Sequence, residues 1–321
     1  MMVIKNKNIL CYSVFIIFLQ FGCNSNPEID DFTTPISDQS DANNIPINDP
    51  DQFIFEGLYS GLYPWGNSLI NNQYKTDYIN ICKSIGNINT IGKNEVEENI
   101  IILSLGPSNP HKIFDGINTA EYNDANFGEN IRFVNGAIGG IDFNDILNIT
   151  GPYWLQVDSI LQSQNISASE VQVIFCIEDD LLNHDTTIAR AFELKENYIQ
   201  LLEQIRLKYP NCVLFLAGDK GYNNYSNEER FSEPKGYLNG WAIKLLVEDY
   251  INGNLPEYPF INWLDYYWAD GDTPRWDGLT YHLSDFIGPD YIHLTTEKAQ
   301  ELGLATHEKL KSDQGALYWY K

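Results

Sequence analysis

Basic residues are scarce in this chain of 321 residues. It has 20 lysines and arginines against 44 aspartates and glutamates, which gives a net charge of −24 at pH 7. The basic residues form no patch along the sequence, so the chain lacks the positive surface that nucleic acid binding requires. The same balance disfavours strongly anionic polymers as substrates. We therefore expect no nucleic acid partner.

Cysteine is also rare, with 5 residues in the whole chain. Cys82, Cys176 and Cys212 belong to the region expected to fold, and the last two lie in apolar runs. We expect these three to be buried free thiols. No cysteine and histidine spacing matches a structural zinc site, and there is no glycine-rich phosphate loop. The sequence therefore predicts neither a metal nor a cofactor.

The first residues have the pattern of a bacterial secretory signal. Lys5 and Lys7 precede an apolar run over residues 9–21, which is too short for a stable membrane span, and Gly22 and Cys23 follow. This predicts a signal peptide over residues 1–22 and a lipid on Cys23, with an ordinary cleaved signal as the alternative. The domain is then exported across the inner membrane and held on the outer membrane or cell surface as a lipoprotein.

A polar segment over residues 23–51 follows, rich in Asn, Asp, Pro and Ser. Such a composition cannot bury enough apolar surface to fold, so it predicts a disordered tether. The remaining residues, 52–321, have a length suited to one domain.

Apolar runs that predict buried strands alternate with helical patterns along this domain. The strands are expected at residues 100–105, 131–134, 171–177, 212–217 and 260–267. The helices are expected at residues 67–85, 153–164, 187–209, 238–251 and 295–310, with a turn or short helix near residue 113. Alternation of this kind predicts an α/β fold with three layers, in which helices cover both faces of a parallel five-stranded sheet.

Polar residues follow the first three of these strands. Ser108 lies on a Gly-Pro corner after the first strand, Asn135 begins the Asn-Gly-Ala-Ile-Gly-Gly loop after the second, and Glu178 opens an acidic triplet after the third. Near the chain end, Asp290 and His293 form an Asp-x-x-His pair. The carboxyl ends of parallel strands meet at one edge of the sheet, where open α/β folds place their sites. Serine, histidine and aspartate are the groups that acyl transfer needs, because histidine takes the serine proton and aspartate orients the histidine.

The order of these motifs resembles the SGNH, or GDSL-type, hydrolases, and most closely a group of bacterial SGNH-like envelope proteins. The resemblance covers about residues 57–304. It implies that Ser108 is the nucleophile, His293 the base and Asp290 the orienting acid. It also implies an oxyanion hole made by the backbone N–H groups of Ser108 and Gly140 with a third donor after the third strand.

Two positions depart from the family pattern. Pro107 replaces the Asp of Gly-Asp-Ser, and Asp180 stands at the best-matching place for the family's third-block Asn, with Asp179 beside it. A carboxylate aimed at a developing oxyanion opposes the charge it should stabilise. Loss of one oxyanion donor costs about 10²–10³ in rate. Asp180 therefore points elsewhere, or is protonated, or makes the enzyme slow.

Other residues compete for these roles. His111, His184, His282 and His307 are the other histidines; His307 is expected at the surface of the last helix, and the Asp-x-x-His spacing favours His293. The acidic triplet after the third strand is also compatible with a divalent cation or with glycosidase carboxylates. Adjacent acids on a strand point to opposite faces, so at most two of them converge.

Aromatic residues crowd the expected loops and suit a sugar ring or an aromatic acyl group. They are Tyr63, Trp65, Tyr222, Tyr225, Trp263, Tyr266, Tyr267, Trp268, Trp276 and Tyr281. Asn109, Asn135, Trp268 and Arg275 are the candidate substrate-binding residues, with pairing of Arg275 to a neighbouring aspartate as the alternative for that residue.

The sequence thus predicts a serine esterase that cleaves a small-molecule or glycan ester, with an acetyl group on a carbohydrate as the suggested substrate. The alternatives are a catalytically inactive lipoprotein of the same fold that binds a glycan, and an acyltransferase with the same three residues.

Overall fold

The computed structural model describes residues 37–38, 45–86, 99–128, 130–256 and 259–321. The predicted signal peptide and the lipidation site at Cys23 lie outside these residues. Residues 45–51, which the sequence predicts as the end of the tether, belong to the folded domain. Ile47 is buried, and its backbone N–H donates to the Tyr266 hydroxyl at 3.1 Å. The folded part therefore begins earlier than the composition predicts.

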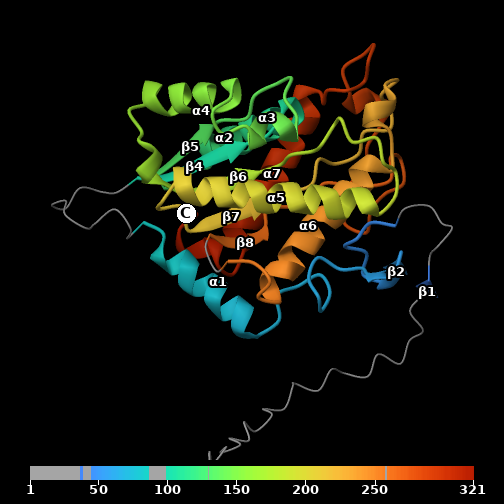
Figure 1. Cartoon of the computed structure of the whole chain (residues 1–321), viewed down its shortest axis with the longest axis horizontal. Coiled ribbons are helices and arrows are strands. Elements are labelled where there is room, and N and C mark those ends of the chain that lie inside the picture. The colour runs from blue at the N-terminus through green and yellow to red at the C-terminus, as the bar shows by residue number, and fades with distance from the viewer. Residues whose placement is uncertain (1–36, 39–44, 87–98, 129, 257–258) are drawn as a thin grey trace, which may run out of the picture. The chain divides into compact units, whose positions relative to one another are not determined.

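Five parallel strands form the central sheet, in the order β5-β4-β6-β7-β8 (Figure 1). Their bounds are β4 Ile100–Leu105, β5 Ile131–Asn135, β6 Val171–Cys176, β7 Leu214–Ala217 and β8 Phe260–Trp263. Every residue of β4, β6, β7 and β8 is buried, which explains why these strands are continuous apolar runs rather than alternating ones. The predicted three-layer α/β/α fold with a parallel five-stranded sheet is confirmed.

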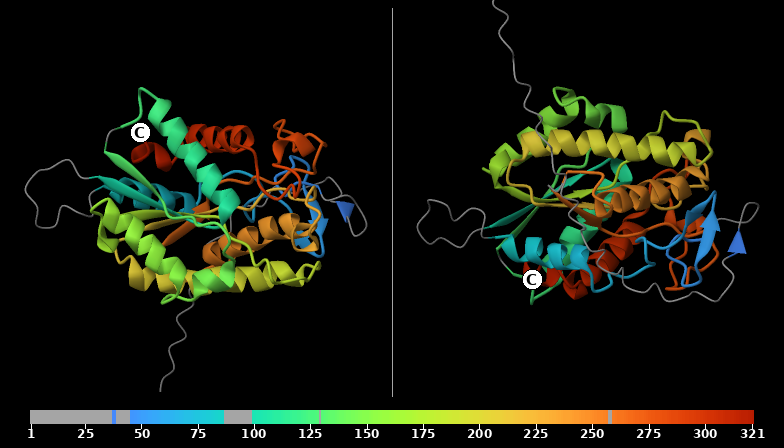
Figure 2. Two further views of the ribbon diagram at one scale, coloured as in Figure 1. Left: turned by 90° about the horizontal axis from the view of Figure 1, so that it is seen from above. Right: turned by 60° about the horizontal axis from the view of Figure 1, so that its bottom comes forward.

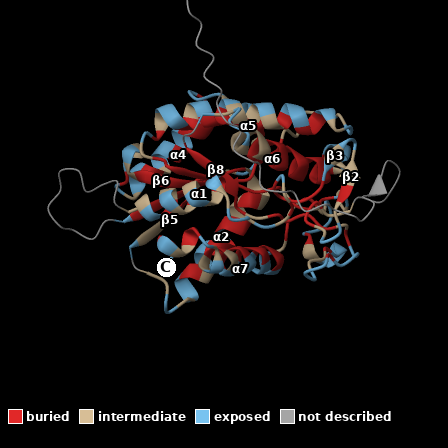
Figure 3. Cartoon of the chain, turned by 90° about the horizontal axis from the view of Figure 1, so that it is seen from below, coloured by how far each residue is buried: buried red, intermediate tan, exposed pale blue. Residues whose placement is uncertain are grey.

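Helices cover both faces of this sheet. They are α1 Gln73–Ser84, α2 Ser108–Asn123, α3 Phe143–Leu147, α4 Pro152–Ser163, α5 Ala189–Lys208, α6 Lys235–Ile251 and α7 Thr296–Ser312. Figure 2 shows α2 and α7 side by side on one face, with α4, α5 and α6 on the other. Most helices bury the face turned to the sheet and expose the outer face, as Figure 3 shows, whereas α6 is buried on all sides from Lys235 to Val247. Within the described residues, no helix is both long and apolar enough to cross a bilayer.

A second, small sheet lies in the N-terminal part of the domain. Its strands are β1 Ser37–Asp38, β2 Phe53–Phe55 and β3 Leu58–Tyr59, where β1 pairs with β2 in parallel and β3 pairs with β2 in antiparallel fashion. The sequence analysis does not predict this sheet, because two- and three-residue strands are too short to show a period in hydrophobicity.

Candidate active site

Ser108 is held at the end of β4 by a turn that only glycine allows. Gly106 has φ +151°, and a Cβ at this position would lie 2.3 Å from the Ile177 carbonyl oxygen. Pro107 follows and caps α2 without a side-chain hydrogen bond. The chain therefore turns sharply from the buried strand into α2 and presents Ser108 as the first residue of the helix.

The start of α2 provides hydrogen-bond donors beside the serine. The first N–H groups of a helix have no partner within the helix, and its positive dipole end favours negative charge. Pro110 lies in the first turn, where its lack of an N–H is tolerated. The loop after β5 comes close as well, since a Cβ on Gly139 would lie 3.5 Å from Ser108 Cβ, and Gly140 adopts φ +79°. The start of α2 and the loop after β5 thus come together beside Ser108, and Gly140 lines the same cavity as the serine.

His293 lies directly against the serine. Its Nε2 is 2.9 Å from Ser108 Oγ, although the two residues are 185 positions apart in the chain. Asn109, the residue after the serine, fixes the loop on both sides of the histidine. Its Nδ2 donates to the Ile292 carbonyl at 2.8 Å and its Oδ1 accepts from the Leu294 N–H at 3.0 Å. Asn109 therefore holds the backbone on both sides of the imidazole, and it also lines the cavity of about 480 Å³ beside Ser108, so the substrate contact predicted for it stays a prediction.

A second side chain of α2 holds the same loop. Lys112 Nζ donates to the Leu294 carbonyl at 2.5 Å, and the His293 carbonyl accepts from the Ile287 N–H at 2.7 Å. The backbone around the imidazole is therefore fixed from α2 and from within the loop.

Asp290 does not orient the ring in this structure. Its carboxylate is exposed and accepts a hydrogen bond from the Ile292 N–H at 3.3 Å. Among the described residues, no hydrogen bond or ion pair joins Asp290 to His293. The two side chains line the same cavity of about 680 Å³, so the carboxylate lies near the ring without contacting it.

The other histidines are engaged elsewhere. His111 Nδ1 is 2.6 Å from the Ala137 carbonyl oxygen, and His282 Nδ1 is 2.6 Å from Asp272 Oδ1. His184 is exposed. His307 is buried in α7, although the sequence analysis expects it at the surface. Of the five, His293 is the histidine whose ring is hydrogen-bonded to Ser108.

The acidic triplet after β6 is arranged so that its carboxylates do not oppose an oxyanion. Asp180 is not among the residues that line the cavity of about 480 Å³ beside Ser108, and it caps its own loop, with Oδ1 accepting from the Asn183 N–H at 3.2 Å. Glu178 and Asp179 line that cavity, and Asp179 is paired with two cations. Arg190 Nη2 lies 2.6 Å from its Oδ1, and Lys220 Nζ lies 2.5 Å from its Oδ2. The doubtful oxyanion role predicted for Asp180 thus has no support in its position.

Burial and ion pairing decide the protonation of the carboxyls of Glu178 and Asp179. Burial alone would raise the pKa of Asp179, but Lys220 and Arg190 outweigh it and hold the pKa below its usual value. Burial raises the pKa of Glu178 well above its usual range, helped by the neighbouring acids, so its carboxyl is favoured in the neutral form. Arg190 and Lys220 together carry one positive charge more than Asp179, and the acids Asp142 and Asp145 also line the cavity.

A cavity of about 480 Å³ opens beside the Ser108 and His293 pair. Its wall is largely apolar, with a few charged groups at one end. The apolar lining residues are Pro107, Pro110, Ile141, Ile177, Leu181, Leu182, Phe231 and Ile292. The charged ones are Asp142, Asp145, Glu178, Asp179, Lys220 and Arg230. The site is therefore a hydrophobic pocket with the nucleophile at one side and a polar corner at the ends of β6 and β7.

Three predicted substrate contacts are structural instead. Asn135 uses its amide internally, donating to the His111 carbonyl at 2.9 Å and to Asp115 Oδ1 at 2.7 Å. Trp268 is 0 % exposed, so no ligand reaches it. Arg275 pairs with Asp277 at 2.6 Å, the pairing that the sequence analysis keeps open for it.

Most of the aromatic residues predicted to line the loops belong to the core. Those that are buried are Tyr63, Trp263, Tyr266, Tyr267, Trp268 and Tyr281. Trp276 is exposed, while Trp65, Tyr222 and Tyr225 are half-buried. The expected aromatic platform for a sugar ring is therefore mostly absent from the surface.

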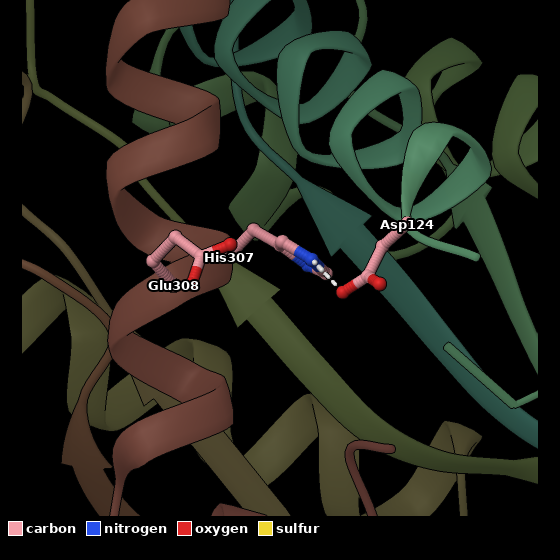
Figure 4. A group of neighbouring side chains, drawn as sticks. All are labelled: Asp124, His307 and Glu308. Carbon is pink, nitrogen blue, oxygen red and sulfur yellow. Dashed lines mark hydrogen bonds and ion pairs between the residues drawn. The ribbon is translucent and has the colours of Figure 1, made fainter. Parts of the chain in front are cut away.

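One group of side chains away from this site has atoms close enough for a cation, namely Asp124, His307 and Glu308. Figure 4 shows the Asp124 carboxylate directed at the His307 ring, with which it interacts at 3.3 Å. The same carboxylate is 2.5 Å from Lys311 Nζ. A lysine ammonium already provides the positive charge that this carboxylate needs, so the group is better explained as an ion-pair network between α2 and α7.

Lys220 and Arg190 are the site residues that the sequence analysis misses. Lys220 follows β7, and the same strand-end rule that points to Ser108 and the acidic triplet would have pointed to it. Arg190 lies in the first turn of α5. Nothing in its local sequence distinguishes it from a surface arginine.

No family model matches the chain, and no curated protein matches it. Solved structures similar to it include a candidate SGNH hydrolase from Slackia heliotrinireducens, at 9% identity and a TM-score of 0.34, over 65% of this chain and 97% of the other. A candidate acylhydrolase from Bacteroides fragilis is similar at 8% identity and a TM-score of 0.35, over 75% of this chain and 97% of the other. Phospholipase A1 from Streptomyces albidoflavus is similar at 14% identity and a TM-score of 0.33, over 66% of this chain and 99% of the other. The structural neighbours are consistently SGNH hydrolases and related acylhydrolases, but at these scores the likeness carries no argument for activity, which has to come from this chain's own residues.

Proposed function

We propose that this protein is a serine ester hydrolase in which Ser108 attacks the ester and His293 moves the proton. The observation that carries the proposal is the 2.9 Å contact between His293 Nε2 and Ser108 Oγ at the start of α2. A hydroxyl within hydrogen-bond reach of an imidazole, at the N-terminus of a helix, is an arrangement that nucleophilic catalysis uses.

The proposed reaction has two stages. Ser108 Oγ attacks the acyl carbon while its proton passes to His293 Nε2, and the carbonyl electrons move to oxygen to give an oxyanion. The oxyanion then collapses, the bond to the leaving alkoxide breaks, and the alkoxide takes the proton from His293. Water repeats both steps on the acyl-enzyme and releases the acid. In this proposal the N–H groups of Ser108 and Gly140 hold the oxyanion.

The size of the cavity indicates the size of the acyl group that the site can hold. A volume of about 480 Å³ with a largely apolar wall exceeds what an acetyl group fills. The aromatic residues that suggested a sugar platform are mostly buried. We therefore propose an acyl group larger than acetyl, and keep acetylated sugars as the comparison substrates.

Hydrolysis of p-nitrophenyl esters from acetate to octanoate tests both points. We expect turnover by the wild-type protein, with kcat/KM rising beyond acetate, and only background rates for Ser108→Ala and His293→Ala. Equal rates in all three proteins would exclude the hydrolase and favour the inactive glycan-binding alternative. Acyl transfer to an added sugar in place of water would favour the acyltransferase.

We also propose that Cys23 carries a lipid and that the domain is anchored in the cell envelope. Metabolic labelling with an alkyne fatty acid, comparing the wild-type chain with Cys23→Ala, tests this. Labelling of both chains or of neither would contradict it.

A further inference from the structure

We infer that Lys220, which follows β7, provides the third oxyanion donor of this site and replaces the asparagine that the family pattern has after the third strand. The inference rests on the proposed ester hydrolase function. The acidic triplet after β6 places carboxylates in the cavity where an oxyanion would form, and a carboxylate there would repel it. A cation paired with the carboxylate removes this repulsion, and Lys220 is such a cation for Asp179.

Lys220 is held firmly in the cavity wall. Its Nζ is 2.5 Å from Asp179 Oδ2, and its backbone N–H donates to Asn239 Oδ1 at 3.1 Å. Asn239 Nδ2 in turn donates to the Glu178 carbonyl at 2.8 Å. One asparagine of α6 thus ties the end of β7 to the end of β6, and with it the lysine to the acidic triplet.

The ammonium has donors to spare. A lysine carries three N–H donors, and Asp179 is the one hydrogen-bond partner of Lys220 Nζ among the described residues. The side chain is 9% exposed, and it lines the same cavity as Ser108 and Gly140. A nearly buried cation with free donors in the same cavity as the nucleophile can receive negative charge that forms there.

The surroundings leave this charge available. Arg190 Nη2 takes the other oxygen of Asp179 at 2.6 Å, so the carboxylate is shared between two cations. Lys235 adds a third positive charge close enough to interact with both Arg190 and Lys220. The two cations that contact Asp179 carry one positive charge more than its carboxylate, while Glu233 also lies close enough to interact with Lys220.

Kinetics with a neutral p-nitrophenyl ester test the inference, since such a substrate has no anionic group of its own. We expect Lys220→Met to lower kcat by about 10²–10³, the usual loss for one oxyanion donor, with KM changed less than about twofold. Lys244 is the matched control. It is a buried lysine in α6 that is paired with Glu248 and lies outside the cavity, so Lys244→Met should leave kcat within about threefold.

A pair of double variants separates donation from charge. In Asp179→Asn with Lys220→Met, the new amide replaces the ion pair and offers its own N–H, so we expect kcat to recover to within about tenfold of wild type. In Asp179→Ala with Lys220→Met no donor remains, and the loss should stay near 10²–10³. Both double variants remove one charge of each sign, so they keep the test decisive if Lys220→Met alone does not fold.

The outcomes are distinct. An unchanged kcat in Lys220→Met, or in the Asp179→Ala double variant, would overturn the inference while the wild-type and Ser108→Ala rates still support the hydrolase. A rise in KM alone would also overturn it and make Lys220 a substrate-binding residue. Absence of hydrolysis by the wild-type protein would instead remove the proposed function on which the inference depends.

Discussion

Replacing Asn109 by alanine should damage catalysis far more than it damages the fold. Asn109 makes two hydrogen bonds to the backbone on either side of His293, at 2.8 and 3.0 Å. Each such bond contributes about 0.5–1.5 kcal/mol net, so the variant should lose about 1–3 kcal/mol of stability. The larger effect is on the imidazole, because misplacement of a catalytic group by about 1 Å costs on the order of 10² in rate.

The assay is steady-state hydrolysis of a p-nitrophenyl ester together with urea unfolding. We expect kcat of Asn109→Ala to fall by about 10²-fold, with KM nearly unchanged because substrate contacts remain. Asn67 is the matched control. It also makes backbone hydrogen bonds with both ends of its amide, to Leu62 and Asn48, and it lies outside the cavities that contain Ser108. Asn67→Ala should lose similar stability and keep its kcat. Equal kcat values for the two variants would refute a positioning role for Asn109.

Three further predictions concern the turn, the acid and a buried carboxyl. Gly106→Ala should lower stability by at least about 1–3 kcal/mol in urea unfolding, whereas Gly253→Ala, also at positive φ but with open space around it, should lose less. Asp290→Ala should lower kcat by about 10–10²-fold, which is less than the loss of about 10⁴ that follows removal of an acid hydrogen-bonded to the catalytic histidine. A loss equal to that of His293→Ala would contradict this and show that Asp290 contacts His293 when substrate is bound. Burial raises the pKa of Glu121 to about 7 from 4.5, so its contribution to stability is present below pH 4.5 and is lost as the pH rises through 7. Glu121→Gln should therefore gain up to about 3 kcal/mol over wild type at pH 8 and little at pH 4.5, as measured by urea unfolding at both pH values, and an equal gain at both would contradict this.

The layered fold was predictable because parallel strands buried on both faces are continuous apolar runs. The starts of β4 and β6 match their predicted positions, and α5 begins two residues after its predicted start. The helix after Ser108 was expected only as a turn or short helix. It runs for 16 residues and packs closely against α7, an element far away in the sequence.

The site was predictable where a rule of topology applied. The carboxyl ends of parallel strands meet at one edge of the sheet, so the sequence predicts that Ser108, Gly140 and the acidic triplet lie near one another. Partners set by tertiary contact were not predictable, because no local signal shows that Arg190 and Lys220 share Asp179 or that Trp268 is buried. Asn109 was identified as a site residue, but its bonds to the loop 183 and 185 residues away could come only from the structure.

One helix carries the nucleophile and both side chains that clamp the segment bearing the base. The hydrogen bonds from Asn109 and Lys112 therefore tie the backbone around His293 to the helix that carries Ser108, and a shift of α2 is expected to carry serine and imidazole together. The other wall of the substrate pocket comes from the ends of β6 and β7, which these hydrogen bonds do not involve. The pocket can therefore widen or narrow around the bound ester while the distance between Ser108 Oγ and His293 Nε2 is preserved.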